Sequence, residues 1–327
     1  MFILGPDWPV VAGGPQRVGP GVASKCAVFP FHVSCLFVQA AFLQFSPAYL
    51  QVEENLATVE SHLSSLNVDL LVLPELFTSG YFFQSRKDLA RVAEPIPEGR
   101  STDALQRWAR SVDATIVAGL PEREGDQFYN SAVVVRPTGV VQTYRKVHLF
   151  YEEKTLFEPG DLGFRVFDET AGDGTEYRLG VMVCFDWYFP EATRTLALKG
   201  ADVIAHPSNL VLPHCPDAMP VRARENHVFT ITANRHGTEE KEGETLSFIG
   251  MSEVCDPTGS ILTRAPQTED TVEVVTFNPL AARDRDLNAY NDVLADRRPD
   301  TYRSEAAAAR NGAAQEGATS DSSTRAA

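Results

Sequence analysis

Three polar side chains follow apolar, strand-like segments and belong to residue types that can share one catalytic reaction. They are Glu75 after LVLP, Lys146 after TYR, and Cys184 after GVMV. A cysteine can act as a nucleophile, a carboxylate can move its proton, and a fixed cation can stabilise an oxyanion. Because such residues gather where strands end at one edge of a sheet, we expect the three side chains to converge. The pattern therefore predicts covalent catalysis by Cys184.

Taken alone, each of the three residues also has an ordinary structural explanation. Glu75 could be an exposed loop carboxylate, Lys146 a solvated lysine, and Cys184 a small buried thiol. The segment after Cys184 leads to Pro190, a residue that is favoured at helix starts. We therefore expect a strand-to-helix elbow at Cys184, where the N–H groups of the helix favour the thiolate. It is the combination of the three residues that favours the catalytic interpretation.

Apolar periodicity indicates the elements that would position these residues. Continuous apolar runs predict buried strands, and apolar residues three and four apart predict helices. A Pro-Thr-Gly sequence between two strand-like segments predicts a hairpin. Mixed βα units and a hairpin favour two sheets over one doubly wound sheet. The expected strands are 36–45, 69–74, 114–120, 130–136, 140–145, 179–184, 203–205, 228–233, 252–255 and 271–277, and the expected helices are 52–66, 101–112 and one that starts at Pro190.

Composition and charge exclude several classes of function. The 327 residues include 44 acidic and 29 basic side chains, a net charge of −15 that repels phosphate backbones, so we expect no nucleic-acid partner. Five cysteines without paired spacing indicate no disulfide framework and favour a cytoplasmic location. The run from Phe29 to Phe45 contains polar residues, which argues against a membrane span or a secretory signal. The motifs GxGxxG, GxxxxGK[ST] and GxSxG are absent.

The two ends of the chain differ in composition from its middle. Residues 1–35 alternate prolines and glycines without helical or strand period, and residues 304–327 are rich in Ala, Ser, Thr and Gly. We interpret both ends as disordered segments, a leader and a tail. Residues 36–303 between them are expected to form one domain.

Five ordered blocks of the sequence resemble the nitrilase, or carbon–nitrogen hydrolase, superfamily over residues 37–303. The resemblance is nearest to its small thermophile-type aliphatic nitrilase/amidase branch. It implies a four-layer αββα sandwich, in which two mixed sheets are flanked by helices, and two such subunits packed into an extended homodimer. The blocks are LVLPELFTSGYFF, YRKVHLFYEEKTLFEPGD, GVMVCFDWYFPEATRTLALKGADVIAHPSN, RARENHVFTITANRHG and FIGMSEVCDPTGSIL.

The resemblance also implies a role for individual residues. Glu75 matches the general base, Lys146 the oxyanion stabiliser and Cys184 the nucleophile. Glu153 matches a second glutamate of the family, which positions substrate and the lysine, while Glu152 is expected to be exposed. The backbone N–H of Phe185 would help to hold the oxyanion, and no metal or organic cofactor is needed. Further candidates for substrate binding are Tyr81, Trp187 and Asn209, for which core packing or a turn is an equal alternative.

The residues after Cys184 bear on the substrate. Amide-hydrolysing branches of the family tend to have Cys-Tyr/Phe-Asp where many strict nitrilases have Cys-Trp-Glu, so Cys184-Phe-Asp186 favours a small aliphatic amide. Hydrolysis of nitriles and of N-carbamoyl compounds stays open. A non-catalytic binding or scaffold protein on the same fold is the alternative from another class, and the intact trio argues against it. A papain-like protease is disfavoured because the Cys184 region has no Cys–His signature.

Other polar segments have weaker interpretations. His206, His214 and Cys215 could suggest a metal site, but loop packing is favoured. Arg222 and Arg224 with Glu225 are expected to share one helix face in a salt-bridged structural role. Residues 237–244 include four glutamates and one lysine, which predicts a solvated loop.

Overall fold

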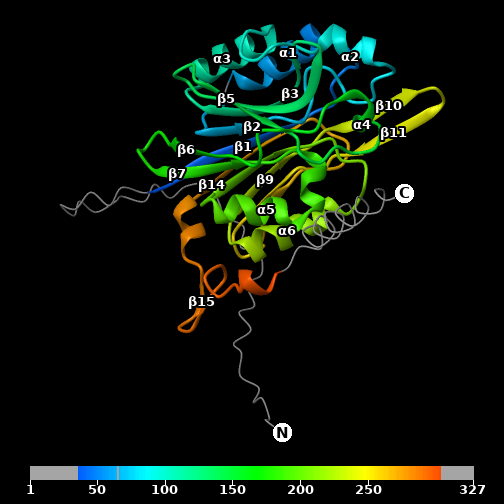
Figure 1. Ribbon diagram of the computed structural model, residues 1–327. Coiled ribbons are helices and arrows are strands. Elements are labelled where there is room, and N and C mark those ends of the chain that lie inside the picture. Colours follow the sequence, from blue (N-terminus) through cyan, green and yellow to red (C-terminus); the bar gives the residue numbers. More distant parts are fainter. Residues whose placement is uncertain (1–35, 65, 303–327) are drawn as a thin grey trace, which may run out of the picture. The chain divides into compact units, whose positions relative to one another are not determined.

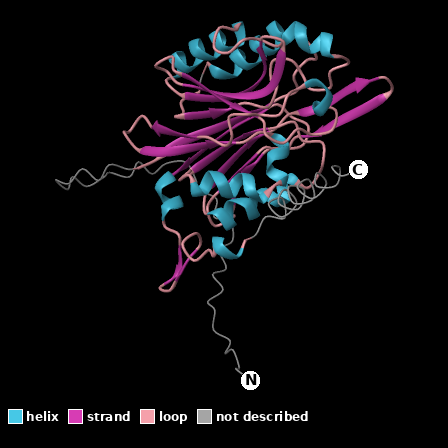
Figure 2. Ribbon diagram, viewed as in Figure 1, coloured by secondary structure: helices cyan, strands magenta, loops and turns pink. Residues whose placement is uncertain are grey.

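The computed structural model describes residues 36–64 and 66–302, and the predicted leader and tail lie outside these residues. Two six-stranded sheets are stacked face to face, and helices cover the outer face of each sheet (Figure 1). Figure 2 shows the same order of layers, with helices above and below the paired sheets. The predicted αββα sandwich is confirmed.

Both sheets are mixed and each contains three adjacent parallel strands. In the first sheet β1, β2 and β3 are parallel, and in the second sheet β7, β8 and β9 are parallel. The first sheet has the order β14 (Thr271–Phe277), β1 (Val38–Gln44), β2 (Leu70–Val72), β3 (Thr115–Glu124), β4 (Gln127–Val135) and β5 (Val141–Arg145). The second has the order β13 (Ile261–Arg264), β12 (Glu253–Cys255), β9 (Phe229–Ala233), β8 (Val203–Pro207), β7 (Glu176–Val181) and β6 (Val166–Thr170).

Alternating side chains bury both faces of the first sheet. In β1, Val38, Ala40 and Phe42 pack into the core between the two sheets. Ala41 and Leu43 point the other way and pack with the helices. Because successive side chains of a strand point to opposite faces, a strand buried on both faces needs the continuous apolar run that the sequence has.

Helices α1 (Val52–Leu63) and α3 (Arg100–Val112) pack on the first sheet, together with α2 (Arg86–Val92). Helices α5 (Pro190–Leu198) and α6 (Cys215–Asn226) cover the second sheet (Figure 1). None of the helices in the described part of the chain is long and apolar enough to cross a membrane. The remaining elements are α4 (Glu153–Leu156), η1 (Cys184–Tyr188), β10 (His236–Lys241), β11 (Glu244–Ile249), η2 (Pro279–Arg283), β15 (Asp286–Asn288), β16 (Asn291–Asp292) and η3 (Pro299–Thr301).

Three local predictions from the sequence are wrong in detail. The strand expected to end at Cys184 ends at Val181, and Cys184 begins the short 3₁₀ helix η1. Residues 237–244 do not form a solvated loop, because they belong to the β10–β11 hairpin and Glu239 within them is buried. The helix predicted over 52–66 ends at Leu63.

Candidate active site

Glu75 lies in the turn after β2 and is fully buried. The backbone of Glu75 packs against Gly119 of β3, where an added Cβ would lie 2.4 Å from the Cα of Glu75. The next residue, Leu76, has a positive φ of 48°, which turns the chain sharply away from the strand. A glycine on the neighbouring strand therefore lets the carboxylate sit at the end of the sheet.

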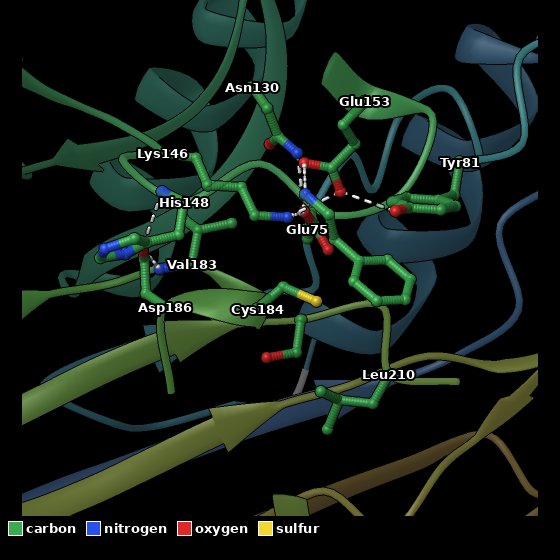
Figure 3. A network of polar contacts seen from close by, with 12 residues as sticks. Glu75, Tyr81, Asn130, Lys146, His148, Glu153, Val183, Cys184, Asp186 and Leu210 are labelled. Carbon is green, nitrogen blue, oxygen red and sulfur yellow. Dashed lines mark hydrogen bonds and ion pairs between the residues drawn. The ribbon is translucent and has the colours of Figure 1, made fainter. Parts of the chain in front are cut away.

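Lys146 follows β5 and is held at the same place by its backbone and its side chain. Its N–H donates to the carbonyl oxygen of Asn130, 2.8 Å away. Its buried Nζ donates to Oε1 of Glu75 at 2.7 Å and to Oε1 of Glu153 at 2.7 Å (Figure 3). Asn130 Nδ2 also donates to Oε1 of Glu75, at 2.7 Å. The other oxygen, Glu75 Oε2, is buried and has no hydrogen-bond partner among the described residues.

Lys146 keeps its positive charge in this site. Burial lowers the pKa of Lys146, but the charges of Glu153 and Glu75 and the hydrogen bond to Glu153 raise it, and the net shift is above its ordinary value. For Glu153 burial acts in the opposite direction and raises the pKa, while the charge of Lys146 lowers it. Three donors favour the ionised form of Glu153: Lys146, the Tyr81 hydroxyl at 2.6 Å and the Phe150 N–H at 3.2 Å.

Cys184 stands at a strained elbow that its neighbours fix. Its φ is +42°, a conformation that costs a non-glycine residue energy and persists only under support. Asp186 gives that support, because its carboxylate accepts the N–H of Val183 at 2.9 Å and the N–H of His148 at 3.1 Å. The Tyr144 hydroxyl donates to the same carboxylate at 2.6 Å (Figure 3). Asp186 thus ties the elbow of the second sheet to the segment that follows Lys146.

The sulfur of Cys184 lies below the Glu75–Lys146 pair in Figure 3, and the charges of both groups act on it. Burial raises the pKa of Cys184 well above its ordinary value, and the charge of Glu75 raises it further, while Lys146 and the backbone N–H of Asn209 lower it. Helix N–H groups were expected to favour the thiolate, and the pKa of the thiol is on balance raised instead. Two carboxylates and one ammonium make the site net negative, so a thiolate is opposed and the thiol needs a base to be activated.

His206 supports the elbow from β8. It is fully buried, and its Nε2 lies 2.9 Å from the carbonyl oxygen of Cys184. Burial lowers the pKa of His206 to about 4, so the ring is neutral and Nε2–H donates to that carbonyl. His206 is thus part of the packing around the nucleophile. Among the described residues, no group of three or more candidate metal ligands is present, so the alternative of a metal site gains no support.

The pH dependence of stability tests this placement of His206. Below pH 6.5 the unfolded chain takes up a proton that folded His206 refuses until about pH 4, so stability falls as the pH falls through this window. The expected loss is about 3 kcal/mol. In His206→Gln that part of the loss disappears, which thermal unfolding followed by circular dichroism between pH 4 and 7 will detect. Equal pH slopes in the two proteins would show that His206 titrates normally.

A small pocket opens beside Cys184. Its empty volume is about 240 Å³, open solvent included, below the usual range for drug-sized ligands. Asn209 is 2% exposed, and neither its Nδ2 nor its Oδ1 has a partner among the described residues. Tyr81 does not line this pocket; it lines another pocket beside Glu153, to which its hydroxyl donates. The pocket is lined by Phe150, Cys184, Phe185, Trp187, Asn209, Leu210, Val211 and Leu212.

The structure brings together Glu75, Lys146, Glu153 and Cys184 as the sequence predicted, and places Phe185, Trp187 and Asn209 at the pocket. Sequence reasoning did not single out Asn130, whose amide fixes Glu75. No local signal marks it, because it lies inside a strand and its partner is 55 positions away. On α6, Arg222 pairs with Glu225 at 3.0 Å, in line with the expected structural role.

Comparison with known proteins gives one consistent family. Residues 39–285 match the family model described as carbon-nitrogen hydrolase. The chain is 48% identical to a nitrilase of Pyrococcus abyssi over 268 residues, which cover 81% of this chain and 99% of that protein. It is 36% identical to an (R)-stereoselective amidase of Pseudomonas sp. over 236 residues, covering 71% and 80% of the two chains.

A solved structure supports the same assignment. It is a variant of the amidase from Nesterenkonia sp. AN1 in which acrylamide has added to the active-site cysteine. Its TM-score to this chain is 0.64 at 28% identity, covering 84% of this chain and 99% of that one. With a family match over most of the described residues, the chain belongs to the carbon–nitrogen hydrolases of the nitrilase superfamily.

Proposed function

We propose that this enzyme hydrolyses a small, uncharged aliphatic amide to a carboxylic acid and ammonia through a thioester on Cys184. The observation that carries the proposal is the unpaired Oε2 of Glu75. Its partner oxygen is held by Lys146 and Asn130, which leaves one buried, oriented acceptor for the thiol proton.

The acylation half-reaction follows from these positions. Glu75 Oε2 accepts the thiol proton as Cys184 Sγ bonds to the amide carbon, and the carbonyl electrons move onto oxygen. Lys146 donates two of its three N–H groups to carboxylates, so the third is available to the oxyanion together with the N–H of Phe185. Glu75 then returns the proton to the amide nitrogen as the carbon–nitrogen bond breaks. Ammonia leaves and the thioester remains.

The deacylation half-reaction uses the same base. A water molecule gives a proton to Glu75 as its oxygen attacks the thioester carbon. The carbon–sulfur bond breaks, the proton passes to Sγ, and the acid leaves. Glu153 keeps Lys146 in place during both steps.

The lining of the pocket supports an uncharged substrate. The side chains that line the pocket include no charged group, and they are mostly aromatic or aliphatic. A cationic N-carbamoyl amine or a zwitterionic substrate would lose its hydration without gaining a partner. We assign apolar contacts to Phe185 and Trp187, and a hydrogen bond with a polar atom of the substrate to Asn209.

A nitrile is the second candidate substrate. It is favoured by the 48% identity to a protein named nitrilase. With a nitrile, Sγ adds to the nitrile carbon to form a thioimidate, which water converts to acid and ammonia.

Asp186, which follows Phe185 in the amidase-like sequence, is fully engaged by protein donors and acts on the elbow rather than on the substrate.

Product analysis with matched substrates tests the proposal. Propionamide, propionitrile and N-carbamoylputrescine are incubated separately with the purified enzyme, and acid, ammonia and carbon dioxide are measured. We expect acid and ammonia from propionamide at a kcat/KM at least about 10-fold above that for N-carbamoylputrescine, because a buried unpaired charge costs more than 1.4 kcal/mol. A higher kcat/KM for propionitrile than for propionamide would show that the preferred substrate is a nitrile and not an amide. Release of carbon dioxide as the main product would contradict both.

The resemblance to the superfamily also supports a homodimer, and the odd number of cysteines supports a cytoplasmic location. Exposed apolar side chains on η1, α5 and α6 supply surface for a second copy: Tyr188, Leu198 and Val221. The alternative of a non-catalytic scaffold has no supporting observation.

A further inference from the structure

The β10–β11 hairpin belongs to neither six-stranded sheet and lies beside α4, the helix that begins at Glu153 (Figure 1). Lys241 of β10 forms an ion pair with Glu152, the residue before Glu153. The hydroxyl of Tyr151 lies 3.2 Å from a carboxylate oxygen of Glu244 on β11. The hairpin therefore contacts the loop after Lys146 directly.

Glu239, within β10, contacts the segment that contains Tyr81. Its carboxylate accepts the N–H of Tyr81 at 3.0 Å and the N–H of Phe82 at 2.6 Å. Arg235, only 1% exposed, forms an ion pair with the same carboxylate. Gly80 has φ +75°, and an added Cβ there would lie 2.6 Å from Oε1 of Glu239, so a glycine leaves room for the carboxylate.

Tyr81 connects this buried pair to the proposed catalytic groups. Its ring meets Phe248 of β11 edge to face, with the ring centroids 5.9 Å apart. Its hydroxyl donates to Oε1 of Glu153 at 2.6 Å, and the same oxygen accepts from Lys146. One continuous set of contacts thus runs from Glu239 through Tyr81 and Glu153 to Lys146.

We propose that Glu239, with Arg235, is a positioning residue that sets the place of Lys146 through the hydroxyl of Tyr81. A buried ion pair contributes little net stability because desolvation offsets its attraction, so stability alone does not account for it. A carboxylate that accepts two adjacent backbone N–H groups does fix the direction of the Tyr81 side chain. This inference rests on the proposed function, in which Lys146 and Glu75 serve Cys184.

The first experiment compares Glu239→Gln with Glu240→Gln. A glutamine at 239 keeps the size but has one acceptor oxygen for three donors, so the Tyr81 segment shifts. Glu240 is exposed on the same strand, and its replacement removes the same charge. We expect kcat to fall about 10- to 100-fold for Glu239→Gln with KM changed less than about 3-fold, because small displacements of catalytic groups cost this much. Glu240→Gln is expected to match the wild type.

A double-mutant cycle separates positioning from simple structural support. Tyr81→Phe removes the hydroxyl and is expected to lower kcat by itself. If Glu239 acts through that hydroxyl, adding Glu239→Gln to Tyr81→Phe costs less than about 3-fold more. Losses that multiply would overturn the proposal, as would wild-type kcat in Glu239→Gln. If Glu239→Gln does not fold, Glu239→Asp, which keeps the charge but withdraws the oxygens, takes its place in the cycle.

A readout that needs no substrate distinguishes this proposal from the proposed function. The rate constant for alkylation of Cys184 by iodoacetamide is measured, with the modified peptide located by mass spectrometry. We expect a decrease of at least about 5-fold in Glu239→Gln and none in Glu240→Gln, because activation of the thiol depends on the Glu75–Lys146 pair. If Cys184 of the wild type reacts with iodoacetamide but the untreated wild type does not hydrolyse amides, the proposed function alone is refuted. Equal alkylation rates in wild type and Glu239→Gln would refute the positioning role.

Discussion

Cys184→Ala is expected to lose amide hydrolysis by about 10⁴-fold or more while the protein stays folded. No other group among the described residues is placed to form the thioester, and loss of a covalent nucleophile has effects of this size. Cys184 is 4% exposed and its positive φ is no worse for alanine, so the melting temperature should move by only a few degrees. Turnover and thermal unfolding measured on the same preparation check both statements.

The matched control is Cys255→Ala, which removes another buried thiol from β12 on the second sheet. It should keep full activity. The wild type mixed with substrate and quenched should gain the mass of one acyl group on the peptide that contains Cys184, and Cys184→Ala should not. Normal turnover by Cys184→Ala would remove the nucleophile from the proposal.

Lys146→Met is expected to damage both activity and stability. Removing one oxyanion donor costs about 10²- to 10³-fold in kcat. The variant also leaves Glu75 and Glu153 buried together without their shared cation, a change that costs about 3–5 kcal/mol. The charge of Lys146 lowers the pKa of Glu153, so its loss raises that pKa in the folded variant. The folded state then binds more protons than the unfolded state, so the loss of stability relative to the wild type grows as the pH rises above about 4.5.

Adding Glu153→Gln to Lys146→Met separates the two effects. The double variant removes one of the two unpaired carboxylates, so stability should recover in part while activity stays low. Chemical denaturation at pH 5 and pH 8, together with the hydrolysis assay, measures both. A Lys146→Met protein as stable as the wild type at pH 8 would mean that the two carboxylates do not depend on the lysine.

Local pattern predicted the central strands well, because β2, β8 and β9 are nearly continuous apolar runs buried on two faces, whereas β6 and β13 were not predicted. The strand over 271–277 has the bounds that the sequence indicated. The strand before Cys184 ends early for a reason the run does not reveal. The Val183 N–H is taken by the Asp186 carboxylate, and this bond starts the elbow.

The β10–β11 hairpin was misjudged because charge composition alone indicates contact with water. Glu239 is buried because Arg235 and the N–H groups of residues 81 and 82 replace that water, and the latter are more than 150 positions away. Asn130 was missed for the same reason, because its partner Glu75 lies 55 positions away in the sequence. The predicted trio had the advantage that each member ends an apolar segment, which is a local signal, and the resemblance supplied the role of each.

The pairing of β14 with β1 has a consequence for the order in which the protein is made. Val38 lies opposite Phe277, so the strand that protects one edge of β1 is translated long after β1 itself. Until then β1 presents unpaired backbone groups, the kind of edge that joins other chains. The Glu75 and Lys146 segments, which lie between these two strands in sequence, are likewise made before the first sheet is complete. A nascent chain stalled before residue 271 should therefore be prone to aggregation and lack a finished catalytic centre.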